Sequence, residues 1–193
     1  MKKRGASQAK LFIVSAPSGS GKTTLCKRLL DEERGIANSI SMTTRPPRPG
    51  EENGVDYIFV SDEFFRLTAG KGGFLEYEEN FGHKYGTPKK FIEDNLKNDR
   101  SVLLSIDVKG ATKVRKAYPE KSVLIFILPP SMNALKKRLH LRNSDDNSAI
   151  SKRLSLAKKE LSFKDKYDYA IVNDRLEGAY GKLKKIIYGE LNR

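Results

Sequence analysis

The sequence predicts an α/β fold in which a parallel sheet is covered by helices on both faces. Apolar segments of strand length lie at residues 11–15, 101–107 and 122–128, and a shorter one lies at 169–173. Segments with helical spacing alternate with these strands, which is the order that a parallel sheet requires. The 193 residues are enough for one well-filled core with small insertions but too few for two large domains. A small, mostly β insertion and a helical lid are expected to interrupt this core.

The composition is that of a globular chain with an excess of positive charge. Hydrophobic residues make up 38% and charged residues 32%, and no stretch approaches the 18 consecutive apolar residues typical of a membrane span. The net charge of +13 is compatible with nucleic acid, an anionic membrane surface or small phosphorylated ligands, and also with solvated lysine-rich helix faces. Aromatic residues do not alternate with the basic runs, so a stacking surface for single strands is not expected. The one cysteine, Cys26, cannot form an internal disulfide, which fits a cytoplasmic location.

Residues 11–24 carry the first functional signal. An apolar strand enters a Gly- and Ser-rich turn, and Gly-Lys-Thr-Thr then opens a helical segment that should end near Gly35. This order is the context of a Walker A phosphate loop, written here A-x-x-x-x-G-K-T because Ala16 replaces the usual first glycine. Small residues let backbone N–H groups surround a phosphate, and the helix N-terminus adds unpaired N–H groups. Lys22 would then reach the β- and γ-phosphates and the Thr23 hydroxyl would bind Mg²⁺, which predicts a P-loop NTPase-type core.

Residues 41–88 are expected to form the mostly β insertion. The prolines and Gly50 in segment 40–51 exclude a helix and leave a stiff loop with Arg45 and Arg48, whose spacing suits a grip on phosphate oxygens. A proline-rich surface loop with solvated arginines is the alternative. The elements expected after this loop are a strand at 55–60, a helix at 62–67 capped by Ser61 or Asp62, a β-prone segment at 74–79, a turn and strand at 80–87, and a helix at 88–96.

The second half of the chain supplies further strands and the lid. The run 101–107 ends in Asp107, and an acid at the carboxyl end of a buried strand is where Walker B chemistry holds Mg²⁺ through water. Ligands of parallel-sheet folds bind outside the carboxyl ends of the strands, so the phosphate loop, Asp107 and Asn173 are expected at one edge. A polar break near Arg142 separates two basic helices that would form a mobile lid over this edge. The helices expected in this half span 111–117, 131–140, 150–161 and 176–191.

With these segments placed, the chain resembles the guanylate kinase family over nearly its full length. The motif S-A-P-S-G-S-G-K-T at 15–23 would not choose among nucleotide-phosphate enzymes, whereas S-x-T-T-R-x-P-R-x-G-E at 41–51 is far more specific. The other matching motifs are N-G-x-D-Y at 53–57, F-L-E-Y at 74–77, K-Y-G-T at 84–87, I-D-V-K-G at 106–110, L-P-P-S at 128–131, L-K-K-R-L at 135–139 and I-V-N-D at 171–174. The resemblance implies ATP-dependent phosphoryl transfer to GMP, and to dGMP, giving ADP and GDP.

The resemblance also implies roles for individual residues. The catalytic residues would be Lys22, Arg45 and the lid arginines Arg138 and Arg153. The cofactor Mg²⁺ would be held by Thr23 and, through water, by Asp107. The residues expected to bind ATP are Ala16, Pro17, Ser18, Gly19, Ser20, Gly21, Lys22, Thr23, Thr24, Arg142 and Asn173. Those expected to bind GMP are Ser41, Arg45, Arg48, Glu51, Tyr57, Glu76, Tyr85, Gly86, Thr87, Asp107 and Gly110. Guanine presents N1–H and N2–H₂ donors and an O6 acceptor, which carboxylates and hydroxyls match, and adenine presents the opposite pattern.

The chain departs from the family pattern at two places. Ser105 stands where the family usually has an acid near the metal or the acceptor, and Asn143-Ser144 replaces the usual lid turn. Two alternative functions remain compatible with the sequence. The chain could be a catalytically inactive guanylate-kinase-like interaction module, or a kinase for another small phosphorylated acceptor. Neither a specific nucleic acid nor a membrane is an expected partner, and no subunit number is predicted. The expected division of the chain is core at 1–40, GMP-binding insertion at 41–88, core at 89–137, lid at 138–160 and core at 161–193.

Overall fold

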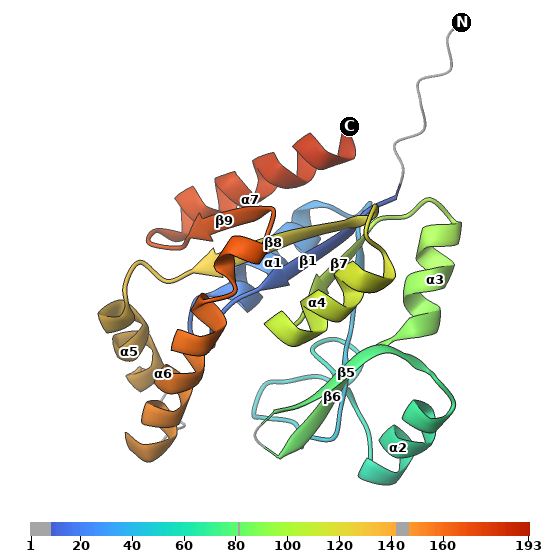
Figure 1. Cartoon of the computed structure of the whole chain (residues 1–193), viewed down its shortest axis with the longest axis horizontal. Coiled ribbons are helices and arrows are strands. Elements are labelled where there is room, and N and C mark those ends of the chain that lie inside the picture. The colour runs from blue at the N-terminus through green and yellow to red at the C-terminus, as the bar shows by residue number, and fades with distance from the viewer. Residues whose placement is uncertain (1–8, 81, 142–146) are drawn as a thin grey trace, which may run out of the picture.

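The computed structural model describes residues 9–80, 82–141 and 147–193, and its centre is a five-stranded sheet (Figure 1). The strand order is β2-β7-β1-β8-β9, and every neighbouring pair is parallel. The bounds are β1 (Leu11–Ser15), β2 (Ala37–Ser39), β7 (Val102–Ser105), β8 (Ser122–Leu128) and β9 (Tyr169–Val172). The α/β fold class expected from the sequence is therefore confirmed.

The core lies on both faces of this sheet, as expected for parallel strands with nearly continuous apolar sequences. Successive side chains of β1 enter different clusters: Phe12 and Val14 pack on one face, and Leu11 and Ile13 on the other. Helices α1 (Lys22–Glu32) and α7 (Leu176–Leu191) cover the first face, and α3 (Lys89–Lys97) and α4 (Val108–Ala117) cover the second. All of β1 is buried, so the loop that follows it starts from a rigid support.

A second, four-stranded sheet lies below the core in Figure 1, beside α3 and α4. Its order is β4-β3-β6-β5, and all its strands fall between Met42 and Pro88. Helix α2 packs on this sheet through Phe65, whose ring stacks on that of Phe74 at 4.4 Å between centroids. The bounds are β3 (Met42–Thr43), β4 (Ile58–Phe59), α2 (Asp62–Gly70), β5 (Phe74–Asn80) and β6 (His83–Pro88).

Helices α5 (Met132–His140) and α6 (Asn147–Leu161) form a third body on the other side of the molecule from this second sheet (Figure 1). They share a separate apolar cluster of Leu135, Leu139, Ile150 and Ala157. A short 3₁₀ helix at Lys164–Lys166 then leads into β9. Among the described helices, none combines the length and the apolar character needed to cross a membrane.

Three elements differ from the sequence-based expectation. Helix α4 begins at Val108 and not at residue 111, because Asp107 itself caps the helix by accepting backbone N–H groups. The strand expected at 55–60 is reduced to Ile58–Phe59, because the preceding residues form a turn in which Asp56 N donates to Glu52 O. Strand β2 was not expected, since three residues are too few to show a period.

Candidate functional site

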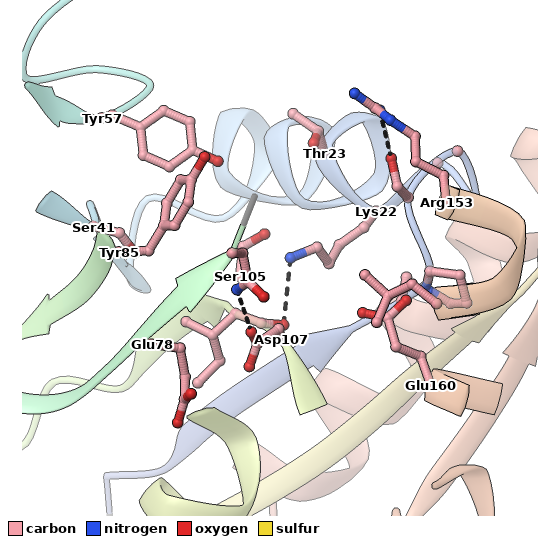
Figure 2. A pocket seen from close by; sticks show the side chains of 18 of the residues that line it. Lys22, Thr23, Ser41, Tyr57, Glu78, Tyr85, Ser105, Asp107, Arg153 and Glu160 are labelled. Carbon is pink, nitrogen blue, oxygen red and sulfur yellow. Dashed lines mark hydrogen bonds between the residues drawn. The ribbon is translucent and has the colours of Figure 1, made fainter. Parts of the chain in front are cut away.

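One cavity of about 300 Å³ lies where the phosphate loop, the second sheet and α6 meet (Figure 2). It is lined by residues from all three parts of the chain and by the carboxyl end of β7. The lining residues are Ala16, Pro17, Ser18, Gly19, Gly21, Lys22, Thr23, Ser41, Arg48, Tyr57, Glu76, Glu78, Asn80, Tyr85, Ser105, Ile106, Asp107, Arg153, Leu156 and Glu160. Segments that are distant in the sequence therefore contribute to one polar cavity.

At two positions of the phosphate loop, the backbone has a conformation that only glycine adopts readily. Gly19 has φ +92° and Gly21 has φ +90°, both in the left-handed region. A Cβ atom at Gly21 would also collide with the Asn173 side-chain amide. That amide donates to Ser20 O at 2.8 Å, so the residue after β9 fixes the loop from the side. The loop is thus held by β1, from which it starts, and by the residue that follows β9.

Lys22, the first residue of α1, directs its ammonium group toward the end of β7 (Figure 2). Its Nζ donates to Ile106 O at 3.4 Å. Burial lowers the pKa of Lys22, while the nearby Cys26 and Asp107 raise it. A desolvated ammonium group beside the N-terminus of α1 is an arrangement that favours an anionic ligand.

Glu76 lies on β5 with only 7% of its surface exposed. The Thr87 hydroxyl donates to its Oε1. Gly110 makes room for the other oxygen, because a Cβ atom there would lie 2.6 Å from Glu76 Oε2. Burial raises the pKa of Glu76 from its ordinary value of 4.5 to about 7, against the opposing effect of the Thr87 hydrogen bond. The carboxylate therefore gains by accepting further donors in the cavity.

Asp107 lies at the centre of the cavity in Figure 2 and is bonded from two directions. As the N-cap of α4, its Oδ1 accepts from Lys109 N at 3.0 Å and from Gly110 N at 2.8 Å. Its Oδ2 accepts from the Asn80 side-chain amide of β5 at 2.7 Å. The carboxylate thus connects the core to the second sheet.

A second, partly buried carboxylate, Glu160 of α6, faces the same space from the opposite side (Figure 2). Burial and, to a smaller extent, the charge of Asp107 raise its pKa from the ordinary value of 4.5 to about 7, against the lowering effect of Lys22. Lys22 therefore lies in the combined field of two carboxyl groups. The two carboxyl groups raise the pKa of Lys22 and so oppose part of the larger lowering caused by burial.

The arginines of the 41–51 loop are held differently. Arg45 is 8% exposed and forms a bidentate ion pair with Glu51, at 2.8 and 2.9 Å from Nη2 to the two carboxylate oxygens. Glu51 also accepts from Arg48 N at 2.8 Å. Arg48 lines the cavity with Tyr57, whose ring lies 5.4 Å from the Arg45 guanidinium carbon. Glu51 therefore shapes the loop, and Arg48 is the arginine of this loop that reaches the cavity.

The lid arginines also occupy different places. Arg153 lines the cavity and donates to Ser18 Oγ of the phosphate loop at 3.3 Å. Arg138 instead donates to Asn173 O at 2.9 Å and is not part of the described lining. Arg142, expected to bind ATP, lies outside the described residues.

The structure brings most of the sequence-predicted residues together, and it places some behind the cavity wall. The predicted residues outside the described lining are Ser20, Thr24, Arg45, Glu51, Gly86, Thr87, Gly110, Arg138 and Asn173. Several of these contact lining residues, as Thr87 contacts Glu76. Gly86 has another reason to be glycine, since a Cβ atom there would lie 2.7 Å from the Phe74 ring. For Thr87 and Gly110, which lie against Glu76, the structure therefore indicates a positioning contact.

Six of the lining residues were not predicted as site residues: Glu78, Asn80, Ser105, Ile106, Leu156 and Glu160. Two periodicities could have identified most of them. Glu78 and Asn80 follow Glu76 at the period of two that places side chains on one face of a strand. Leu156 and Glu160 follow Arg153 at spacings of three and seven, which lie on one face of a helix.

Comparisons with known proteins agree with this architecture. The sequence model of the family described as guanylate kinase matches residues 8–190. A guanylate kinase of Wolbachia pipientis wMel is 48% identical over 184 residues, which cover 95% of this chain and 92% of that protein. One of Nitrosomonas europaea is 46% identical over 180 residues, covering 93% and 89%. The crystal structure of guanylate kinase from Anaplasma phagocytophilum superposes with a TM-score of 0.82 at 36% identity, covering 97% of this chain and 88% of that one. The chain belongs to the guanylate kinase family.

Proposed function

We propose that the chain transfers the γ-phosphoryl group of ATP to GMP, and to dGMP, giving ADP and GDP. One observation carries the proposal: a single cavity is lined by the phosphate loop at one end and by the buried carboxylate of Glu76 at the other. A phosphoryl donor and a purine acceptor could therefore bind to the same cavity. Holding two reactants in line supplies much of the acceleration in phosphoryl transfer, because little covalent chemistry is needed.

The donor nucleotide would bind at the phosphate loop, with its phosphates against the N–H groups of the loop and of α1. Lys22 would approach the transferring phosphoryl group, because its side chain lines the cavity beside the loop. Arg153 would add positive charge from α6, since it already contacts Ser18 of the loop. Arg138, which now donates to Asn173 O, would join it only after movement of the lid, which is part of the proposal. Arg142 and Asn173 are proposed to contact the base region of ATP.

Mg²⁺ is the proposed cofactor, and the residues present fit it. Among the described residues there is no group of three or more His, Cys, Asp or Glu that could hold a metal on its own. Mg²⁺ in kinases is usually held by one or two protein oxygens together with substrate phosphates and water, so a sparse donor set is suitable. The Thr23 hydroxyl and, through water, Asp107 line the cavity and would complete such a set. The ion would neutralise charge on the transferring phosphoryl group.

The acceptor GMP would bind between the second sheet and α4. Glu76 would accept from the guanine N–H donors, with Thr87 and Gly110 positioning its carboxylate. Ser41 and Asp107 would take part in reading the base, and Arg48, Tyr57 and Tyr85 would bind the phosphate, since all five line the cavity. Arg45 would act on the phosphate directly or through the shape of the loop, which Glu51 maintains. A cytoplasmic location is also proposed, in keeping with the buried, unpaired Cys26.

The decisive experiment is a steady-state assay of ADP formation with Mg·ATP and GMP, dGMP, AMP, UMP or CMP as the acceptor. We expect GMP to give a kcat/KM at least about a hundredfold above that of AMP, because a mismatched polar site leaves buried groups unpaired. Absence of ADP formation with every acceptor would favour an interaction module. A preference for AMP, UMP or CMP would identify a kinase of different acceptor specificity.

A further inference from the structure

The geometry points to Asn80 as a positioning residue for guanine recognition, which orients Asp107 so that one carboxylate oxygen is presented to the 2-amino group of the base. This inference rests on the proposed function. Asn80 lies at the end of β5 and Asp107 at the start of α4, so the contact joins the second sheet to the core. Its partner atoms are 2.7 Å apart and partly buried.

The hydrogen bonds of the Asp107 carboxylate leave few acceptor positions for a ligand. A carboxylate has two oxygens and about four lone-pair positions. Asp107 Oδ1 already accepts two backbone N–H groups of α4, and Oδ2 accepts one N–H of Asn80. One position therefore remains on Oδ2 for a ligand in the cavity that Asp107 lines. Two fixed partners on different elements determine the orientation of the carboxylate, and hence the direction of this last position.

The surroundings of Asn80 favour the guanine over the metal as the partner for that position. Glu76, Glu78 and Asn80 alternate along β5, and each contacts α4 or its N-cap residue. Glu76 lies against Gly110, and Glu78 pairs with Lys113 at 2.6 Å. The hydrogen bond from Asn80 therefore orients Asp107 Oδ2 toward β5, the strand that carries Glu76, whose carboxylate is proposed to bind the base. If the base takes this position, Asp107 has none left for a water of Mg²⁺, and the metal role proposed for Asp107 would pass to the water and nucleotide phosphates beside Thr23.

The contact also explains how the chain works with Ser105 at the cavity wall. Ser105 is neutral and lines the cavity together with Asn80 and Asp107. Because Ser105 carries no charge, it does not repel the Asp107 carboxylate as an acid would. The side chain that donates a hydrogen bond to Asp107 Oδ2 is the Asn80 amide. Recognition of the 2-amino group would then depend on a residue of the insertion that does not itself need to touch the base.

The test compares GMP with IMP, which lacks only the 2-amino group. The ratio of kcat/KM for GMP to that for IMP is measured with saturating Mg·ATP for the wild-type chain, Asn80→Leu and Asn80→Asp. Leucine has a similar size and no donor, and aspartate keeps the shape but brings a second carboxylate against Asp107. We expect the ratio to fall about tenfold or more in both variants, through a higher KM for GMP, with the KM for ATP unchanged.

The matched control is Glu79→Gln, an exposed position on the opposite face of the same strand, which should keep the wild-type ratio. An unchanged ratio in both Asn80 variants, or equal losses for GMP and IMP, would overturn the inference, since a purely structural role lowers both substrates alike. A similar fall in Glu79→Gln would overturn it too. If the wild-type chain forms no ADP from GMP, the proposed function fails and the inference fails with it. If the wild-type chain is active and the Asn80 variants keep its ratio of GMP to IMP, the inference fails but the proposed function stands.

Discussion

Replacing Glu76 by glutamine should stabilise the nucleotide-free protein at alkaline pH while weakening its activity on GMP. The carboxyl group is 7% exposed, and its pKa is raised from 4.5 to about 7, mainly by burial. A carboxyl with a higher pKa in the folded chain binds its proton more tightly there than in the unfolded chain. Its contribution favours folding at low pH and is lost as pH rises from about 4.5 through about 7.

The size of the effect follows from that interval. Each pH unit corresponds to about 1.4 kcal/mol, so ionising Glu76 in the folded chain costs about 3 kcal/mol of unfolding free energy. Glutamine has nearly the same shape, keeps a hydrogen bond to Thr87 and has no charge to bury. In a chain of this length, about 3 kcal/mol corresponds to an increase in Tm of roughly 6–12 °C.

The assay is thermal unfolding followed by circular dichroism at pH 5 and pH 8 without nucleotides. We expect the variant and the wild type to differ little at pH 5, and the variant to melt higher at pH 8. In parallel, kcat/KM for GMP at pH 8 should fall roughly 10- to 100-fold, because a charge-assisted hydrogen bond to guanine is lost. The exposed Glu79→Gln on the same strand should change neither quantity. An equal or lower Tm for Glu76→Gln at pH 8 would refute the reasoning, since the buried charge would then cost nothing.

Three further substitutions test the supports of the site. Gly21→Ala introduces a side chain at φ +90°, which costs about 1–2 kcal/mol, and should raise the KM for ATP at least about tenfold with GMP binding retained. Gly110→Ala places a Cβ atom 2.6 Å from the Glu76 carboxylate and should raise the KM for GMP with the KM for ATP unchanged. Glu51→Gln removes the anion that holds Arg45, so the KM for GMP should rise roughly tenfold in the same assay. If the kinetic constants of a variant matched those of the wild type, the role proposed here for the substituted residue would be wrong.

The parallel core could be predicted from the sequence because its signals are local. Strand β8 is an unbroken apolar run stopped by two prolines, and α7 begins and ends where its apolar spacing does. The start of α4 was misplaced for a physical reason: Asp107 was assigned to ligand chemistry, while its Oδ1 also caps the helix. Short edge elements such as β2 carry too few residues for any period to show.

Residues of the candidate site could be predicted only where they belong to a recognisable sequence motif. Lys22 and Glu76 belong to recognisable segments, but Asn80 and Glu160 become site residues through packing of distant elements. Their contacts, such as that of Asn80 with Asp107 across 27 positions of the chain, depend on how the second sheet meets α4. No local pattern contains that information, because it is a property of tertiary packing.

The electrostatics of the cavity suggest that it is built for the ligands and not for the stability of the nucleotide-free protein. Burial opposes the charged forms of Lys22, Glu76 and Glu160, and the pKa of each is shifted toward neutrality. A phosphate would restore a partner to Lys22, and the guanine N–H groups would do the same for Glu76. Each nucleotide should therefore favour the charged form of the group that it meets, and the energy lost by burying these groups would be recovered on binding. Because the two nucleotides would meet different groups of one cavity, recovery would be complete only when both are bound, which is the complex in which transfer would take place.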